Sequence, residues 1–165
     1  MAKKKFLLLF LLCSLLPLAF AQAFLSLGWF GGATTNKGQW LKEEILLLPK
    51  AAGDVHWRLV YVSDKAGCDS SCQNAHYGMQ QVYTALGRKQ QHLELWQSGG
   101  DKFAAMQWQK NPVGVDALQQ KLVLVDLNGL ALMTYPVTED KTQMVQTGKA
   151  ILTDLNKLLK YDRGL

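Results

Sequence analysis

The feature that most constrains the fold is a pair of cysteines between a predicted strand and a predicted helix. Cys68 and Cys72 enclose three residues; an apolar run at 56–62 precedes them, and apolar residues recur at helical spacing through 73–88. The sequence therefore predicts that a strand delivers two thiols to the N-terminus of a helix. The positive end of the helix dipole favours thiolate at that position.

The remaining patterns predict an α/β domain over residues 56–165. Residues 98–118 are polar and irregular, and Asn128-Gly129 is a strong hairpin signal. Three further strands and an amphipathic helix are expected at 92–96, 121–126, 130–135 and 138–160. The expected order is β-α-β, then a β-hairpin and a C-terminal α-helix.

The N-terminal segment, residues 1–30, is basic and then apolar. Lys3, Lys4 and Lys5 precede an uncharged stretch from Phe6 to Phe30. A membrane-spanning helix needs about 20 apolar residues. This length, with Trp29 and Phe30 at its outer end, favours an uncleaved anchor. The alternative is a signal peptide cleaved after Ala21.

The positive-inside rule places the three lysines in the cytoplasm and the rest of the chain on the other side of the membrane. Residues 31–55 are expected to form a linker and short N-terminal strands. The net charge is +5, of which the three N-terminal lysines supply 3, so residues 31–165 carry 5 − 3 = +2. This charge argues against a nucleic-acid partner. No phosphate-binding loop, hydrolase triad or zinc spacing is present.

The cysteine pair has three interpretations. An exported domain is oxidised, so Cys68 and Cys72 form a disulfide unless they are reduced or bound to metal. A structural disulfide is disfavoured because so short a loop gains little stability from closure. The pair is then either redox-active or a thiolate site for Cu(I). His76, one helical turn after Cys72, either ligates the same metal or packs inward on an apolar stripe with Met79, and the stripe favours packing.

These features resemble the SCO/SenC family, and in particular small proteobacterial membrane proteins associated with cytochrome oxidase assembly. The resemblance rests on the basic start and apolar anchor and on the segments 35–41, 68–88, 123–129 and 135–136. It implies a thioredoxin-like fold in the periplasm, anchored in the inner membrane by a single span. It further implies copper as cofactor and a cytochrome c oxidase subunit, or another assembly factor, as partner.

Two pieces of the related mechanisms are missing. SCO proteins use a third copper ligand, a His before the third core strand, but residues 113–120 contain no His and the positions nearest the strand are Gln119 and Gln120. Thioredoxin-type oxidoreductases carry a cis-Pro immediately before that strand, whereas Pro112 lies well upstream. Two hypotheses remain: a Cu(I)-binding assembly factor, or a thiol–disulfide oxidoreductase acting on cysteines of an oxidase subunit. In the second, Cys68 and Cys72 are catalytic.

Overall fold

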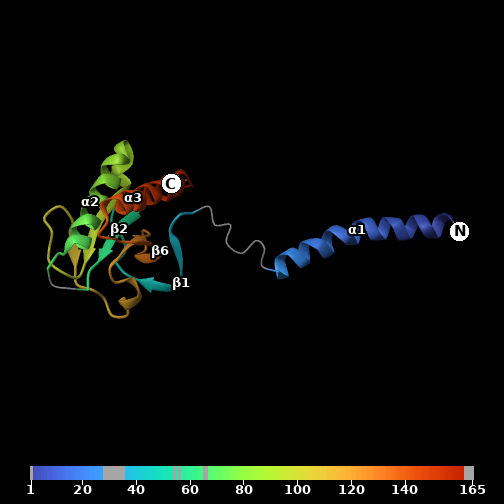
Figure 1. Ribbon diagram of the computed structural model, residues 1–165, viewed down its shortest axis with the longest axis horizontal. Helices are drawn as coiled ribbons and strands as arrows, with labels where there is room; N and C mark the ends of the chain where they lie inside the picture. Colours follow the sequence, from blue (N-terminus) through green and yellow to red (C-terminus); the bar gives the residue numbers. More distant parts are fainter. Residues whose placement is uncertain (1, 28–35, 54, 56, 65–66, 162–165) are drawn as a thin grey trace. The chain divides into compact units, whose positions relative to one another are not determined.

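The computed structural model describes residues 2–27, 36–53, 55, 57–64 and 67–161 (Figure 1). The chain divides into two compact units, Met1–Thr35 and Asn36–Leu165. The described residues of the first unit contain one helix, α1, which spans Ala2–Ser26. Within its segment Lys4–Phe24, an 18-residue window has a mean hydropathy of 2.3.

Helix α1 is long and apolar enough to cross a membrane, and an N-terminal signal sequence has the same properties. Pro17 lies within the helix, as membrane helices tolerate. The expected aromatic belt at Trp29 and Phe30 and the first part of the expected linker lie outside the described residues.

The second unit is built on a six-stranded mixed sheet with the order β1-β6-β5-β2-β3-β4. Strand β2 pairs in parallel with β3 and antiparallel with β5, and β5 pairs antiparallel with β6. The strands are Gln39–Leu46, Trp57–Val62, Leu93–Ser98, Gln107–Gln109, Lys121–Val125 and Leu130–Pro136, for β1 to β6 in chain order.

The predicted order of elements is confirmed. Helix α2, Ser70–Ala85, connects the parallel strands β2 and β3, and helix α3, Lys141–Tyr161, follows the β5–β6 hairpin. Two 3-10 helices complete the unit, η1 at Gly87–His92 and η2 at Asp116–Leu118. Strand β1 lies in the segment where short strands were expected, and the structure adds β4 within a segment predicted to be irregular.

The central strand explains why the sequence shows a continuous apolar run there. Alternate residues of β2 point to opposite faces of the sheet. Leu59 and Tyr61 belong to a core shared with α2 and α3, whereas Val60 and Val62 belong to a second core that includes Leu118. Every residue of β2 is buried, because helices cover one face and loop segments cover the other.

The N-terminal edge of the unit is held to α3 by a buried carboxylate. Asp154 is fully buried and accepts hydrogen bonds from the backbone N–H groups of Lys37 and Gly38 at 2.8 Å each, and from the Tyr135 hydroxyl at 3.0 Å. Lys157 adds a longer ion pair at 3.8 Å. This contact holds residues 37 and 38, at the start of the described part of the second unit, against α3.

Candidate metal and redox site

The loop that carries the cysteines is positioned by backbone hydrogen bonds. After β2, the Ser63 N–H donates to the Ser98 carbonyl at 2.8 Å, so the loop begins beside the end of β3. Gly67 has a φ of +88° and its N–H donates to the Asp101 carboxylate at 3.0 Å. Helix α2 then begins with Asp69 as N-cap, whose side chain accepts from the Cys72 N–H at 2.9 Å.

The two cysteines form a disulfide across the first turn of α2. Their Cα atoms are 5.2 Å apart, within the usual range of about 4.4–6.8 Å. The two differ in accessibility, because Cys72 is buried with 3% of its surface exposed and Cys68 is half-buried. The predicted disulfide state is thus the state seen here, with Cys68 as the more accessible sulfur.

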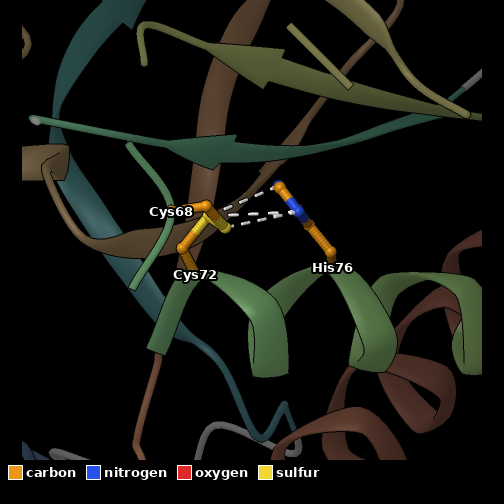
Figure 2. Close-up of side chains that lie close together, drawn as sticks. All are labelled: Cys68, Cys72 and His76. Carbon is orange, nitrogen blue, oxygen red and sulfur yellow. Dashed lines mark hydrogen bonds between the residues drawn. A yellow bond between two sulfur atoms is a disulfide. The ribbon is translucent and has the colours of Figure 1, made fainter. Parts of the chain in front are cut away.

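His76 lies directly against this pair (Figure 2). Its Nδ1 is 3.9 Å from the Cys68 sulfur and 4.0 Å from the Cys72 sulfur, and its Nε2 is 3.9 Å from the Cys72 sulfur. One ligand atom from each of the three residues lies within 4.8 Å of the other two. The three side chains are therefore close enough to bind a single metal ion.

His76 is also packed inward, as its stripe on the helix predicts. Only 6% of its surface is exposed. Its ring meets Tyr61 edge-on at a centroid distance of 5.6 Å, and Phe103 at 4.0 Å. The two interpretations of His76 are compatible, because residues four apart share a helix face, and the face that packs inward also carries the Cys72 sulfur.

Burial sets the protonation state of the site. Desolvation lowers the pKa of His76, and a hydrogen-bonding effect of the Gln97 side chain partly opposes it. The imidazole is therefore neutral at physiological pH, with a lone pair available to a metal. Burial also raises the pKa of the Tyr61 hydroxyl to about 12, with the charges of Asp69 and Asp64 adding to the effect.

A cleft of about 250 Å³ opens beside the disulfide. It is lined by Tyr61, Ser63, Asp64, Gly67, Cys68, Asp69 and Cys72. The cleft gives an approaching molecule access to the half-buried Cys68 sulfur. Both of its charged lining residues are carboxylates, which favour a cation over an anion there.

The two glutamines at the end of the 113–120 segment contribute no ligand. The Gln119 side-chain amide donates to the Asp116 carboxylate at 3.1 Å. Gln120, in the left-handed region with a φ of +55°, donates its N–H to the Val62 carbonyl and its side-chain amide to Asp64. Gln120 therefore contacts the cleft through its lining residue Asp64. Among the described residues, no peptide bond is cis.

Phe103 and Gln97 are site residues that the sequence did not indicate. Phe103 lies in a segment without periodicity, and Gln97 resembles the polar end of a strand. The i, i+4 spacing of Cys72 and His76 was the one available signal for a three-residue cluster. Met79 is fully buried in the core, and Cys13 belongs to the separate unit that contains α1.

The sequence matches no known family model, and neither the curated proteins nor the solved structures contain a match.

Proposed function

We propose that this protein is a membrane-anchored SCO/SenC-like assembly factor of cytochrome c oxidase that handles Cu(I) through Cys68, Cys72 and His76. The observation that carries the proposal is the convergence of two sulfurs and one imidazole nitrogen within 4.8 Å of one another. Thiolates and imidazole are soft or borderline ligands, and this set suits Cu(I) better than a hard cation such as Mg²⁺.

The sheet topology supports a thioredoxin-like fold. The run β3-β2-β5-β6, with one parallel pair followed by two antiparallel pairs, contains the β-α-β and hairpin-helix halves in the expected order. The cysteines lie between the first core strand and the helix that follows it. This is the position from which thioredoxin-like proteins present their functional cysteines.

In this proposal His76 takes the place of the missing third ligand. Residues 113–120, immediately before β5, contain no His, whereas an SCO protein carries one there. Here an imidazole reaches the sulfurs from α2 instead, one helical turn beyond Cys72. The ligand set is the same in kind and its third member comes from another element.

Metal uptake requires reduction of the disulfide. Two thiols of a donor, such as a partner dithiol, transfer two electrons and two protons to the Cys68–Cys72 bond and become a disulfide themselves. Cu(I) then displaces the thiol protons, because the thiolate is the ligand. The half-buried Cys68 and the cleft beside it are where a reductant or a copper donor makes contact.

In this proposal α1 stays attached, crosses the inner membrane once and holds the domain in the periplasm. The length and hydropathy of α1 support the span, and the lysines at its start support the orientation. The partner is a cytochrome c oxidase subunit or another assembly factor, which the resemblance alone suggests.

A second candidate function is thiol–disulfide exchange on cysteines of an oxidase subunit. The unequal burial of the two sulfurs favours it. In the reduced chain the accessible Cys68 thiolate attacks the substrate disulfide, and the buried Cys72 then resolves the mixed disulfide. In that case the protein is an enzyme, a thiol–disulfide oxidoreductase. Its substrate disulfide is reduced as the Cys68–Cys72 bond re-forms.

The test is titration of the reduced full-length chain in detergent with Cu(I), against a competing chromophoric chelator under anaerobic conditions. We expect one Cu(I) per chain, no binding by Cys72→Ser, and weaker binding by His76→Ala. Ser14→Ala, in α1, is a matched control that should leave binding unchanged. Failure of the reduced chain to bind Cu(I), together with reduction of a disulfide peptide, would replace this proposal with the oxidoreductase.

A further inference from the structure

Gln97 is a buried polar residue next to the site. It lies on β3 with 1% of its surface exposed, and the parallel register places it opposite Tyr61 of β2. Residues paired in this way point to the same face of a sheet. The Gln97 side chain therefore lies on the face that carries Tyr61, His76 and α2.

The orientation of the Gln97 amide is fixed by its nitrogen. Nε2 donates to the Gly99 carbonyl at 3.1 Å and to the Asp101 carbonyl at 2.8 Å. Both of its hydrogens are used, so the amide cannot exchange its oxygen and nitrogen without losing two hydrogen bonds. Because Asp101 also holds the Gly67 N–H, this arrangement is continuous with the cysteine loop.

The Gln97 oxygen, by contrast, is an acceptor without a donor. Oε1 is buried and has no hydrogen-bond partner among the described residues. Buried polar atoms are nearly always paired, and an exception calls for an explanation. His76 packs against Tyr61, the strand neighbour of Gln97, so the imidazole lies on the same face of the sheet as this side chain. In keeping with this, Gln97 raises the His76 pKa against the effect of burial.

The two nitrogens of His76 are not equivalent toward the sulfurs. Nδ1 is within 4.0 Å of both sulfurs, whereas the contact recorded for Nε2 is with Cys72 alone. Nδ1 is therefore the better placed nitrogen for a metal shared with both thiolates. A neutral imidazole can offer Nδ1 to a metal only when its proton is on Nε2.

We propose that Gln97 is a positioning residue that selects the metal-ready tautomer of His76. Its Oε1 accepts the Nε2–H of His76, and this bond leaves the Nδ1 lone pair directed at Cys68 and Cys72. The inference rests on the proposed Cu(I) site and names a residue that tunes it. Ligating imidazoles commonly donate their second N–H to such an acceptor, which fixes ring orientation and raises ligand basicity.

In the disulfide form the hydrogen bond is not closed, and Oε1 remains unpaired. In the reduced chain this hydrogen bond forms and satisfies the acceptor, and binding of a metal at Nδ1 then fixes the proton on Nε2 and holds the ring in place. Because the metal-bound form gains a hydrogen bond that the disulfide form lacks, Gln97 favours metallation. In the metal-free reduced chain, the hydrogen bond to Gln97 keeps the proton of His76 on Nε2.

The first experiment is ¹⁵N NMR of the His76 ring in the reduced, metal-free full-length chain in detergent. We expect a proton on Nε2 and a bare Nδ1 in the wild type. A wild-type ring protonated on Nδ1 overturns the proposal without any variant. This readout stays valid even where the chain binds no Cu(I), so failure of this inference and failure of the proposed function are distinguishable.

Two substitutions then separate positioning from structural support. Gln97→Met removes both the acceptor and the two donor bonds, whereas Gln97→Glu removes the donor bonds and keeps an acceptor. We expect Gln97→Met to weaken Cu(I) binding about 10–100-fold, as loss of such partners typically does, and Gln97→Glu to restore most of it. The exposed Gln107 of β4 supplies the control, and Gln107→Met should change nothing.

Equal losses in the two Gln97 variants, with the same His76 tautomer as the wild type, would show a structural role only and overturn the proposal. Thermal unfolding of each variant shows whether it is folded. Where Gln97→Met does not fold, the tautomer measured in the wild type decides.

Discussion

Replacing Asp154 with Ala should be among the most destabilising single changes in the domain. The carboxylate is fully buried and accepts from two backbone N–H groups, of Lys37 and Gly38, and from the Tyr135 hydroxyl. A hydrogen bond to a charged group contributes about 1.5–3 kcal/mol. The three bonds share one acceptor group and are not additive. Removing one partner of a buried charged network costs about 3–5 kcal/mol, and we expect a loss in that range.

The assay is urea unfolding of the full-length chain in detergent, followed by the near-ultraviolet signal of the domain. In a thermal scan of a domain of this size, the same loss of free energy of unfolding corresponds to a fall in Tm of roughly 10–20 °C. Tyr135→Phe removes one of the three bonds and should cost about 1.5–3 kcal/mol. The neighbouring exposed Thr153 offers a control, and Thr153→Ala should stay within about 0.5 kcal/mol.

A double-mutant cycle between Asp154→Ala and Tyr135→Phe should show coupling, because the two side chains share a hydrogen bond of 3.0 Å. A loss below about 1 kcal/mol for Asp154→Ala would refute the reasoning. It would mean that Asp154 does not hold the N-terminal edge of the domain.

Three further predictions concern the fold and the anchor. Gly129→Ala should destabilise the domain by roughly 2–5 kcal/mol in urea unfolding, because the φ of Gly129 is +95° and a Cβ there would overlap the Leu48 carbonyl. Gly53→Ala is the control: its φ is +69° but the surrounding space is open, so it should cost only about 1–2 kcal/mol. Burial, with the Asp154 charge adding, raises the pKa of Tyr135 above its unfolded value of about 10. The stability that it contributes is present below pH 10 and lost above it, so the advantage of wild type over Tyr135→Phe should shrink as pH rises past 10. Mass spectrometry of isolated membranes should find the N-terminus uncleaved, and a chain beginning at Gln22 would contradict the anchor.

The central elements were predictable because local patterns and burial agree there. Strand β2 is buried on both faces and therefore appears as an unbroken apolar run, and the stripe on α2 marks its inward face. The sequence does not indicate strand β4, because it has only three residues, Gln107–Gln109, of which two are glutamines and most are exposed. They become a strand only through parallel pairing with β3.

The site was predictable only in part, for a related reason. The cysteine loop can be recognised in the sequence, and the spacing of Cys72 and His76 indicates that they share one face of a helix. The placement of Gln97 on this face depends on the register of β3. The contact between His76 and Phe103 depends on a loop far along the chain from α2. The contact between Asp154 and Lys37 joins residues 117 positions apart, and no local pattern encodes it.

The ligand set of bound copper is the central claim, and X-ray absorption at the copper edge tests it most directly. The reduced full-length chain is loaded with one equivalent of Cu(I) and measured beside His76→Ala prepared in the same way. We expect two sulfur neighbours and one nitrogen neighbour in the wild type, and loss of the nitrogen in His76→Ala. Copper bound without sulfur, or a spectrum unchanged by His76→Ala, would contradict it.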